Sequence, residues 1–194
     1  YGPQAAWREL QAILDCRGLV TGLDLAGDEA NYPGSLFVEH VGRARDAGLH
    51  ITIHAGEAAG PESVRQAVED LGAERIGHAI RAVGDEALMD LLAERRIGIE
   101  ANLTSNVQTS SVPDYPQHPM RRFLERGLLA SINTDDPGIS NITLRHEYET
   151  AALAAGLSAA MIHQAQANAL ETAFLNSAEK QALAARKAAG SPRV

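Results

Sequence analysis

The chain alternates between short runs of apolar residues and longer stretches in which apolar residues recur every three or four positions. Five apolar runs of strand length occupy residues 18–25, 50–54, 75–80, 97–102 and 130–134. A turn of small residues and then an amphipathic helical pattern accompany these runs. Because strands that alternate with helices pair in parallel through right-handed crossovers, this pattern predicts an α/β protein.

Proline and glycine mark the ends of several predicted helices. Pro61 and Pro119 begin helical patterns, where the missing proline N–H is tolerated, and Gly48 and Gly127 follow the ends of helical patterns. Three more helical patterns follow the last predicted strand, at residues 142–155, 158–169 and 177–187, with Asn141, Ser158 and Ser177 as expected N-caps. The pattern therefore predicts five βα units followed by extra C-terminal helices.

Two architectures fit this order of elements. A doubly wound sheet usually carries a glycine-rich phosphate turn after its first strand, and neither G-x-G-x-x-G nor a Walker sequence occurs here. A (β/α)8 TIM barrel instead places its chemistry at the C-terminal ends of several strands, and the polar residues of this chain follow that pattern. Since five units are too few to close eight strands, we expect residues 1–194 to form a single partial barrel domain whose N-terminal strands are absent from the chain.

Composition narrows the possible functions. Of the 194 residues, 45% are hydrophobic and 22% charged, as in globular proteins, and 17 Lys and Arg against 25 Asp and Glu give a net charge of −8 without a basic run. Nucleic acid is therefore not an expected partner. The single cysteine, Cys16, excludes an internal disulfide and a Cys-rich zinc cluster. Without an apolar stretch of membrane length or a charged leader, we expect a cytoplasmic protein that binds no membrane.

The second predicted strand ends in a histidine that is followed by an acid. Alternation places Thr52 and His54 on the face opposite Ile51 and Ile53, and the small residues after His54 form a tight turn before Glu57. A histidine beside an acid suits a metal ligand with a neighbouring general acid or base. A hydrogen-bonded structural histidine and a glutamate ahead of a helix explain these residues equally well.

The fifth predicted strand ends in two carboxylates. Ser131, Asn133 and Asp135 share its inward face by alternation, and Asp136 projects the other way. Two adjacent carboxylates are costly unless a cation or a proton donor compensates them, so a divalent metal on Asp135 and a substrate donor on Asp136 are expected. The alternative is an ordinary capped turn, because Asp-Asp-Pro-Gly is also a common turn sequence.

Three further segments place polar groups at strand ends. His78 ends the third strand, Gly27 follows the first, and hydrogen-bonding residues 104–106 follow the fourth. Gly27 permits close approach of a ligand to the backbone, although a plain turn glycine fits as well, and His78 alone also fits a core histidine. The remaining histidines, which are His40, His50, His118, His146 and His163, read as structural. No H-E-x-x-H or G-x-S-x-G sequence is present.

With these residues identified, the chain resembles the C-terminal part of the bacterial adenosine deaminases, which belong to the amidohydrolase superfamily. The resemblance rests on five segments in family order and spacing, at residues 22–29, 54–58, 75–78, 103–106 and 131–138. It implies a zinc-dependent hydrolase that deaminates adenosine and 2′-deoxyadenosine to inosine and 2′-deoxyinosine in purine salvage, releasing ammonia. A small-molecule purine nucleoside is the partner that this resemblance implies.

The resemblance also implies roles for individual residues. His54 and Asp135 would hold one Zn²⁺ per complete active site, and Glu57 would donate a proton to purine N1. His78 would orient the attacking hydroxide and stabilise its attack on C6, with Asp135 a catalytic group as well as a ligand. For the substrate, Asp136 would bond N7 and the backbone of Gly27 would bond N3.

One departure from the family is large. The family supplies two further zinc ligands from a His-x-His motif, and this sequence contains no His-x-His. Since catalytic zinc usually keeps three protein ligands, we expect the chain alone to bind zinc weakly and to be inactive. Two other functions stay open: deamination of adenine or an N6-substituted purine, which Gly77 before His78 disfavours by resemblance, and non-catalytic purine binding.

Overall fold

The computed structural model describes residues 2–188 and contains one five-stranded parallel sheet. Its strands are β1 (Gly22–Leu25), β2 (His50–Ala55), β3 (Arg75–His78), β4 (Gly98–Ala101) and β5 (Leu129–Ile132). They lie side by side in sequence order, β1-β2-β3-β4-β5. A doubly wound sheet would reverse direction at a switch point, so this order excludes that alternative and gives part of a TIM barrel. The predicted fold class is confirmed.

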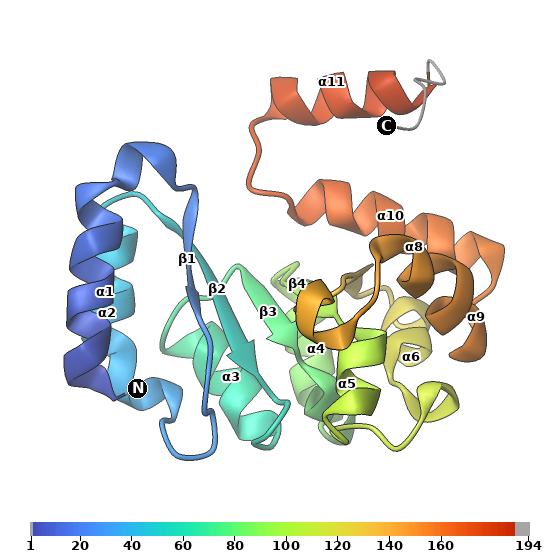
Figure 1. Cartoon of the computed structure of the whole chain (residues 1–194), viewed down its shortest axis with the longest axis horizontal. Helices are drawn as coiled ribbons and strands as arrows, with labels where there is room; N and C mark the ends of the chain where they lie inside the picture. Colours follow the sequence, from blue (N-terminus) through green and yellow to red (C-terminus); the bar gives the residue numbers. More distant parts are fainter. Residues whose placement is uncertain (1, 189–194) are drawn as a thin grey trace.

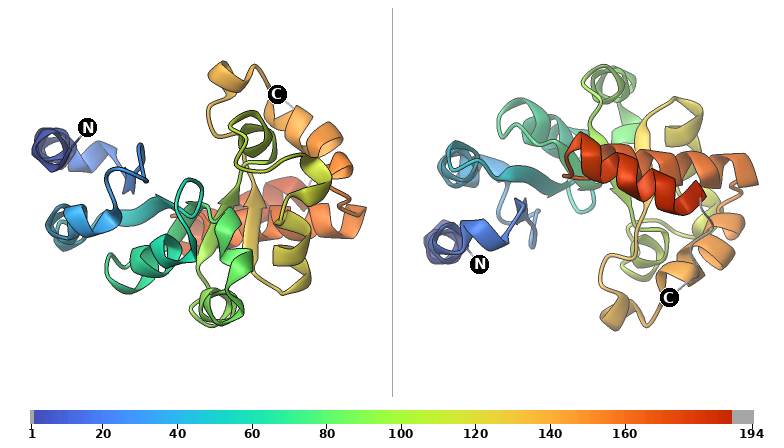
Figure 2. Two further views of the ribbon diagram at one scale, coloured as in Figure 1. Left: turned by 90° about the horizontal axis from the view of Figure 1, so that it is seen from below. Right: turned by 90° about the horizontal axis from the view of Figure 1, so that it is seen from above.

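Helices connect and flank the strands (Figure 1). The α-helices are α1 (Pro3–Asp15), α2 (Val38–Asp46), α3 (Pro61–Glu69), α4 (Glu86–Glu94), α5 (Leu103–Gln108), α6 (Met120–Glu125), α7 (Pro137–Ser140), α8 (Leu144–His146), α9 (Ala152–Ala154), α10 (Ala159–Thr172) and α11 (Ser177–Ala188). A π-helical turn (Glu147–Ala151) joins α8 to α9, and short 3₁₀ turns cover Arg17–Leu19, Gly34–Phe37, Ile80–Gly84 and Tyr115–Gln117. Figure 2 shows α2, α3, α4 and α6 following one side of the curved sheet.

The register of the sheet separates an apolar row from a polar one. Ile53, Ile76 and Ile99 are paired neighbours across β2, β3 and β4, and all three are buried in the core. One position further along the strands, on the other face, His54 pairs with Gly77 and Gly77 with Glu100. Because successive side chains of a strand alternate between faces, the apolar row packs against the helices while the polar row faces the barrel interior.

The observed elements differ from the predicted ones at several ends. The first predicted strand is too long, because Arg17–Leu19 forms a 3₁₀ turn, and α1 was not predicted at all. The third strand ends at His78 rather than residue 80, because the backbone enters the left-handed region at His78 and stays there at Ala79, so the extended strand cannot continue. These differences move boundaries and leave the five strands in place.

The predicted caps of the C-terminal helices are correct once and wrong twice. Ser158 accepts a hydrogen bond from the N–H of Met161 and caps α10 as expected. Thr143, rather than Asn141, caps the start of α8. Asn141 instead follows the last residue of α7 and has a φ of 53°. In front of α11, the side chain of Asn176 accepts two backbone N–H groups, so it occupies the position predicted for Ser177.

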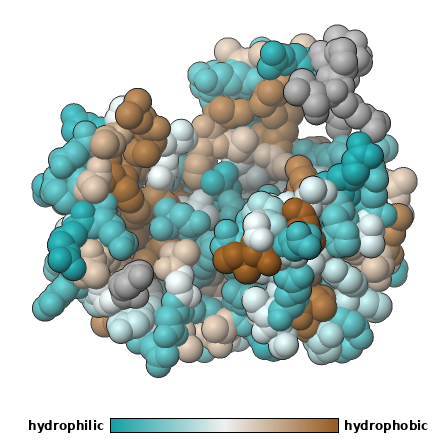
Figure 3. All heavy atoms as spheres, in the orientation of Figure 1, coloured by the Kyte–Doolittle hydropathy of each residue, from teal (hydrophilic) through white to brown (hydrophobic). Residues whose placement is uncertain are grey.

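The sheet has two edges, at β1 and β5, each of which pairs with one neighbour. Figure 3 shows hydrophobic residues along β1, and Leu19 and Val20 just before that strand are exposed. Among the described residues, no helix is long and apolar enough to cross a bilayer. The extent of the predicted domain, residues 1–194, reaches past the described part of the chain and stays a prediction.

Candidate active site

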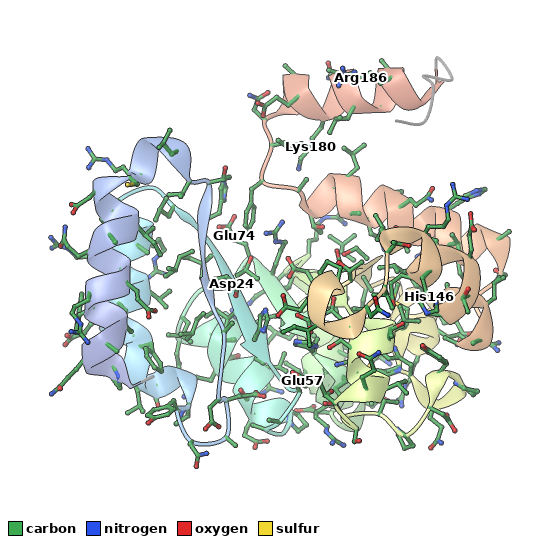
Figure 4. The ribbon with its side chains drawn as sticks, in the orientation of Figure 1. Asp24, Glu57, Glu74, His146, Lys180 and Arg186 are labelled. Carbon is green, nitrogen blue, oxygen red and sulfur yellow. The ribbon has the colours of Figure 1, made fainter. Side chains whose placement is uncertain are left out.

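An open cleft lies at the C-terminal ends of the strands, where a barrel carries its chemistry. Its walls include Asp24, His54, Glu100, Asn102, Asp135, Asp136 and Tyr148. Glu57 and Glu74 lie at opposite ends of the strands in Figure 4, because Glu57 follows β2 whereas Glu74 precedes β3. The predicted residues His54, Asp135 and Asp136 therefore line one cleft, although they come from segments some 80 positions apart.

His54 projects from β2 into this cleft, as strand alternation predicted. Its Nε2 lies 3.2 Å from a carboxylate oxygen of Asp24, which comes from the neighbouring strand β1. Burial works to lower the pKa of His54, but the hydrogen bond and charge of Asp24 and the charges of Asp135 and Glu100 outweigh it, so its pKa is raised. The ring nitrogen therefore faces a strongly negative environment, which favours a bound cation.

His78 forms the buried centre of the site. Its Nε2 lies 3.3 Å from Oε2 of Glu57 and 3.9 Å from Oδ2 of Asp135. The ring also contacts that of His54 edge-on, with 4.9 Å between the ring centroids. Burial, together with the nearby His54, lowers the pKa of His78 against the opposing effect of the two carboxylates. The sequence-predicted catalytic residues Glu57, His78 and Asp135 thus meet around one imidazole.

Backbone strain, rather than strand alternation, orients two of these residues. β5 ends at Ile132, and Asp135 has a φ of 56°, so its side chain is placed by a turn and not by continued alternation with Ser131. His78 likewise has a φ of 69°. Left-handed backbone is uncommon for residues other than glycine, and such strain concentrates at functional sites. The predicted alternation from Ser131 therefore stops at Ile132, although Asp135 does line the cleft, and the role of Asp135 stays a prediction.

The short helix α5 supplies two polar side chains and one backbone N–H to the site. Ser105 donates a hydrogen bond to Asp135 over 2.7 Å, and Asn106 donates to Oε1 of Glu57 over 3.2 Å. The backbone N–H of Thr104 donates to the buried carboxylate of Glu147, which belongs to the π-helical turn. Burial raises the pKa of Glu147, opposed by its hydrogen bonds to Thr104. Segment 104–106 was predicted to provide such groups, whereas Glu147 has no sequence signal beyond its helical pattern.

Gly27 lies beside the site rather than in the main cleft. It lines a smaller adjoining pocket together with Glu29, Tyr32 and His54. Its φ of 126° is open to glycine alone, so the predicted close-approach glycine does have a special backbone. Glu29, which the sequence did not single out, accepts backbone N–H groups from four consecutive residues, 56–59, and so fixes the loop that carries Glu57.

Gly77 has a steric reason to be glycine. A Cβ at this position would lie 2.5 Å from Cδ2 and 3.0 Å from Nε2 of the His54 ring. We expect Gly77→Ala to displace that ring and to destabilise the fold by about 1–3 kcal/mol, the usual cost of overpacking. Urea unfolding and the ring resonances of His54 measure both effects.

Gly42→Ala in α2 is the matched control, because a Cβ there meets nothing within 4 Å. Alanine in a helix is expected to add about 0.5–1 kcal/mol of stability relative to glycine, leaving His54 unmoved. Unchanged His54 resonances in Gly77→Ala would show that the ring does not depend on the space above this glycine.

The donors of the cleft fit part of a zinc site. Imidazole nitrogen and carboxylate oxygen are zinc ligands, and His54 and Asp135 present them to one cleft with an excess of negative charge. Within residues 2–188, no three His, Cys, Asp or Glu side chains are grouped closely enough to hold a metal ion. The described residues therefore offer two of the three protein ligands that catalytic zinc usually takes.

Comparisons with known proteins point to one enzyme family. The family model described as adenosine deaminase matches residues 3–188. An adenosine deaminase of Escherichia coli O157:H7 is 60% identical over 97% of this chain and 57% of its own length. The chain thus spans little more than half the length of the curated relatives that it matches.

Solved structures agree in fold. An adenine deaminase from Arthrobacter aurescens superposes with a TM-score of 0.89 at 27% identity, covering 94% of this chain and 56% of that one. An amidohydrolase from Burkholderia ambifaria with bound zinc has the same TM-score and identity, covering 97% and 53%. These relatives share the sheet and the helices that position the cleft.

Proposed function

Because this chain belongs to the adenosine deaminase family, we propose that it supplies the C-terminal half of a site that hydrolyses adenosine or 2′-deoxyadenosine to inosine or 2′-deoxyinosine and ammonia. The observation that carries the proposal is the meeting of Glu57 and Asp135 at the Nε2 of His78. An acid, an imidazole and a metal-ligand carboxylate that meet in this way are the groups that hydrolytic deamination requires.

His54 and Asp135 would hold the zinc ion, with further ligands from outside the described residues. When bound there, zinc supplies the Lewis acidity that activates water near neutral pH. Ser105 orients the Asp135 carboxylate through the 2.7 Å hydrogen bond. Such supporting contacts fix the geometry of metal ligands and tune their basicity.

The remaining residues act on the purine. Glu57 would hand a proton to N1, which makes C6 more electrophilic, and its carboxylate is held for this by hydrogen bonds from Asn106, Thr109 and Ser111. Through its Nε2, which faces Asp135 at the cleft, His78 would stabilise the oxygen that attacks C6. Asp136 lines the cleft where a donor such as the N7 side of the purine would be recognised, and Gly27 lines the adjoining pocket.

The experiment is to complete the site. We would join this chain to the portion of the E. coli O157:H7 relative that it does not cover, since the two are 60% identical where they match. We expect this chimera to bind one zinc ion and to deaminate adenosine, whereas the 194-residue chain alone binds zinc weakly and shows no measurable turnover. Zinc content and loss of adenosine absorbance measure the two properties.

The substrate is tested with the same chimera. Adenosine, 2′-deoxyadenosine, adenine and an N6-methylated purine nucleoside are compared by kcat/KM. A preference for adenine, the substrate named for the A. aurescens structure, would replace adenosine in the proposal. A chimera that folds and binds zinc without deaminating any of them would refute catalysis and favour non-catalytic purine binding.

A further inference from the structure

Asn106 touches both the proposed acid and the proposed imidazole of the site. Its side chain is fully buried on α5, with Nδ2 at 2.9 Å from Nδ1 of His78 and 3.2 Å from Oε1 of Glu57. On its other side, Oδ1 lies 3.2 Å from Nε2 of His118, which is 3% exposed. A buried amide that bridges two reactive groups requires a definite orientation, because its oxygen and nitrogen have opposite hydrogen-bonding roles.

The direction of these hydrogen bonds follows from one unambiguous donor. The backbone N–H of Met120 donates to Nδ1 of His118 over 3.1 Å, so Nδ1 accepts and the proton of this ring lies on Nε2. Burial, assisted by the nearby His78, lowers the pKa of His118 to about 4, which keeps the ring neutral at pH 7. His118 therefore donates through Nε2 to the Asn106 oxygen, and the Asn106 NH₂ group must face His78 and Glu57.

The same sequence of donors determines the proton position on His78. Its Nδ1 receives hydrogen bonds from Asn106 and, over 3.3 Å, from the buried amide of Asn102. A neutral imidazole that accepts at Nδ1 carries its proton on Nε2. That Nε2–H points toward Glu57 and toward Asp135, which lines the cleft.

We infer that the Met120 N–H, His118 and Asn106 form a hydrogen-bond relay that fixes His78 in its Nε2–H tautomer. His118 and Asn106 are positioning residues, since they act on the reaction through His78 and Glu57. This assignment replaces the structural role that the sequence predicted for His118. The tautomer stands on the contacts alone, whereas its effect on turnover rests on the proposed function.

A fixed tautomer matters because a donor that already points into the cleft needs no rearrangement when negative charge develops there. The wrong tautomer would present a lone pair at Nε2 and repel the attacking oxygen. The second Asn106 hydrogen meanwhile holds Oε1 of Glu57, so one amide sets both groups relative to each other. A leucine of similar volume at position 106 would fill the same space but would fix neither the tautomer of His78 nor the position of the Glu57 carboxylate.

The test reads the ring protons directly in the 194-residue chain. Long-range ¹H–¹⁵N spectra distinguish a protonated ring nitrogen from an unprotonated one, and we expect Nε2–H at both His78 and His118. In Asn106→Asp, a carboxylate replaces the donor, so we expect Nδ1 of His78 to become protonated. Nδ1–H in the wild-type ring of either histidine would overturn the relay, whether or not the variant folds.

Asn168→Asp is the matched control, because it makes the same isosteric change in another buried amide. Asn168 donates to the backbone carbonyls of Leu128 and Ala130, away from the cleft. We expect this variant to lose stability but to keep Nε2–H at His78. If Asn106→Asp also keeps it, the orientation of Asn106 does not control the tautomer and the relay is wrong.

The effect on turnover is measured in the chimera. We expect Asn106→Asp to lower kcat about 10²-fold with a smaller change in KM, the size of effect seen when one aligned donor is removed. An inactive parent chimera with Nε2–H at both rings would refute the proposed function and leave the relay intact. An active chimera whose kcat is unchanged by Asn106→Asp would show that the tautomer has no catalytic role.

Discussion

Replacing Glu57 with Gln in the active chimera is expected to lower kcat about 10³-fold, within the range of 10²–10⁴ for loss of a general acid or base. The amide has nearly the shape of the carboxyl group and can still accept the hydroxyl hydrogen bonds of Thr109 and Ser111. It has no acidic proton to give to a purine nitrogen. We therefore expect KM to change by only a few fold.

Zinc content separates this effect from damage to the metal site. Glu57 contacts His78 and α5 rather than His54, so Glu57→Gln is expected to keep the zinc of the parent chimera. Glu94→Gln at the exposed end of α4 is the control for the substitution itself. A Glu57→Gln chimera that retains more than a tenth of the parent kcat would mean that another group supplies the proton.

The fold could be predicted because apolar residues recur along the sequence with the periods of strands and helices. A strand buried in a parallel sheet repeats an apolar residue on the helix-facing side, and Ile53, Ile76 and Ile99 do so in register. The helix α1 has the same kind of periodic signal, because Trp7, Leu10 and Leu14 recur at helical spacing, although only Leu10 of the helix is fully buried. Strand ends were less predictable than strands, since the positive φ of His78 has no signature in a residue that is not glycine.

The residues of the site likewise fall into a group that the sequence pattern could predict and a group that it could not. Alternation placed His54 in the cleft, and position at or just after a strand end singled out Glu57, His78 and Asp135. Their supporting residues could not be predicted, because each contact joins distant segments through one local geometry: 12 positions separate Asn106 from His118, and 27 separate Glu29 from Gly56. Such contacts depend on loop conformation, which neither periodicity nor composition encodes.

Glu29 provides the second large effect, this time on stability. We expect Glu29→Gln in the 194-residue chain to lower the free energy of unfolding by about 3 kcal/mol at pH 7. Its carboxylate accepts the N–H groups of Gly56, Glu57, Ala58 and Ala59 at 2.6–3.2 Å. Hydrogen bonds to a charged acceptor are each worth about 1.5–3 kcal/mol. Because Glu29 is only partly buried and glutamine keeps one acceptor oxygen, we expect the loss of stability to be smaller than the sum of the four hydrogen bonds.

Glu62→Gln is the control for this loop, because Glu62 accepts a single N–H, from Gly60, at 3.3 Å and is exposed. We expect it to change the stability by less than about 0.5 kcal/mol, as for other surface substitutions. Urea unfolding monitored by circular dichroism measures both variants. Equal stability of Glu29→Gln and Glu62→Gln would show that the four short contacts contribute little.

The pH dependence gives a sharper test, because the carboxylate of Glu29 is stabilised in its charged form. Partial burial works to raise its pKa, but hydrogen bonds from Ser63 and from the backbone of Gly56, Ala59 and Ala58 outweigh it and lower the pKa. A lowered pKa stabilises the fold above the unfolded value of about 4.3, and this contribution is lost as the pH falls through the folded value. The stability difference between wild type and Glu29→Gln should therefore be constant near neutrality and shrink below about pH 4. A difference that stays constant throughout the acid range would mean that the charge of Glu29 does not hold the loop.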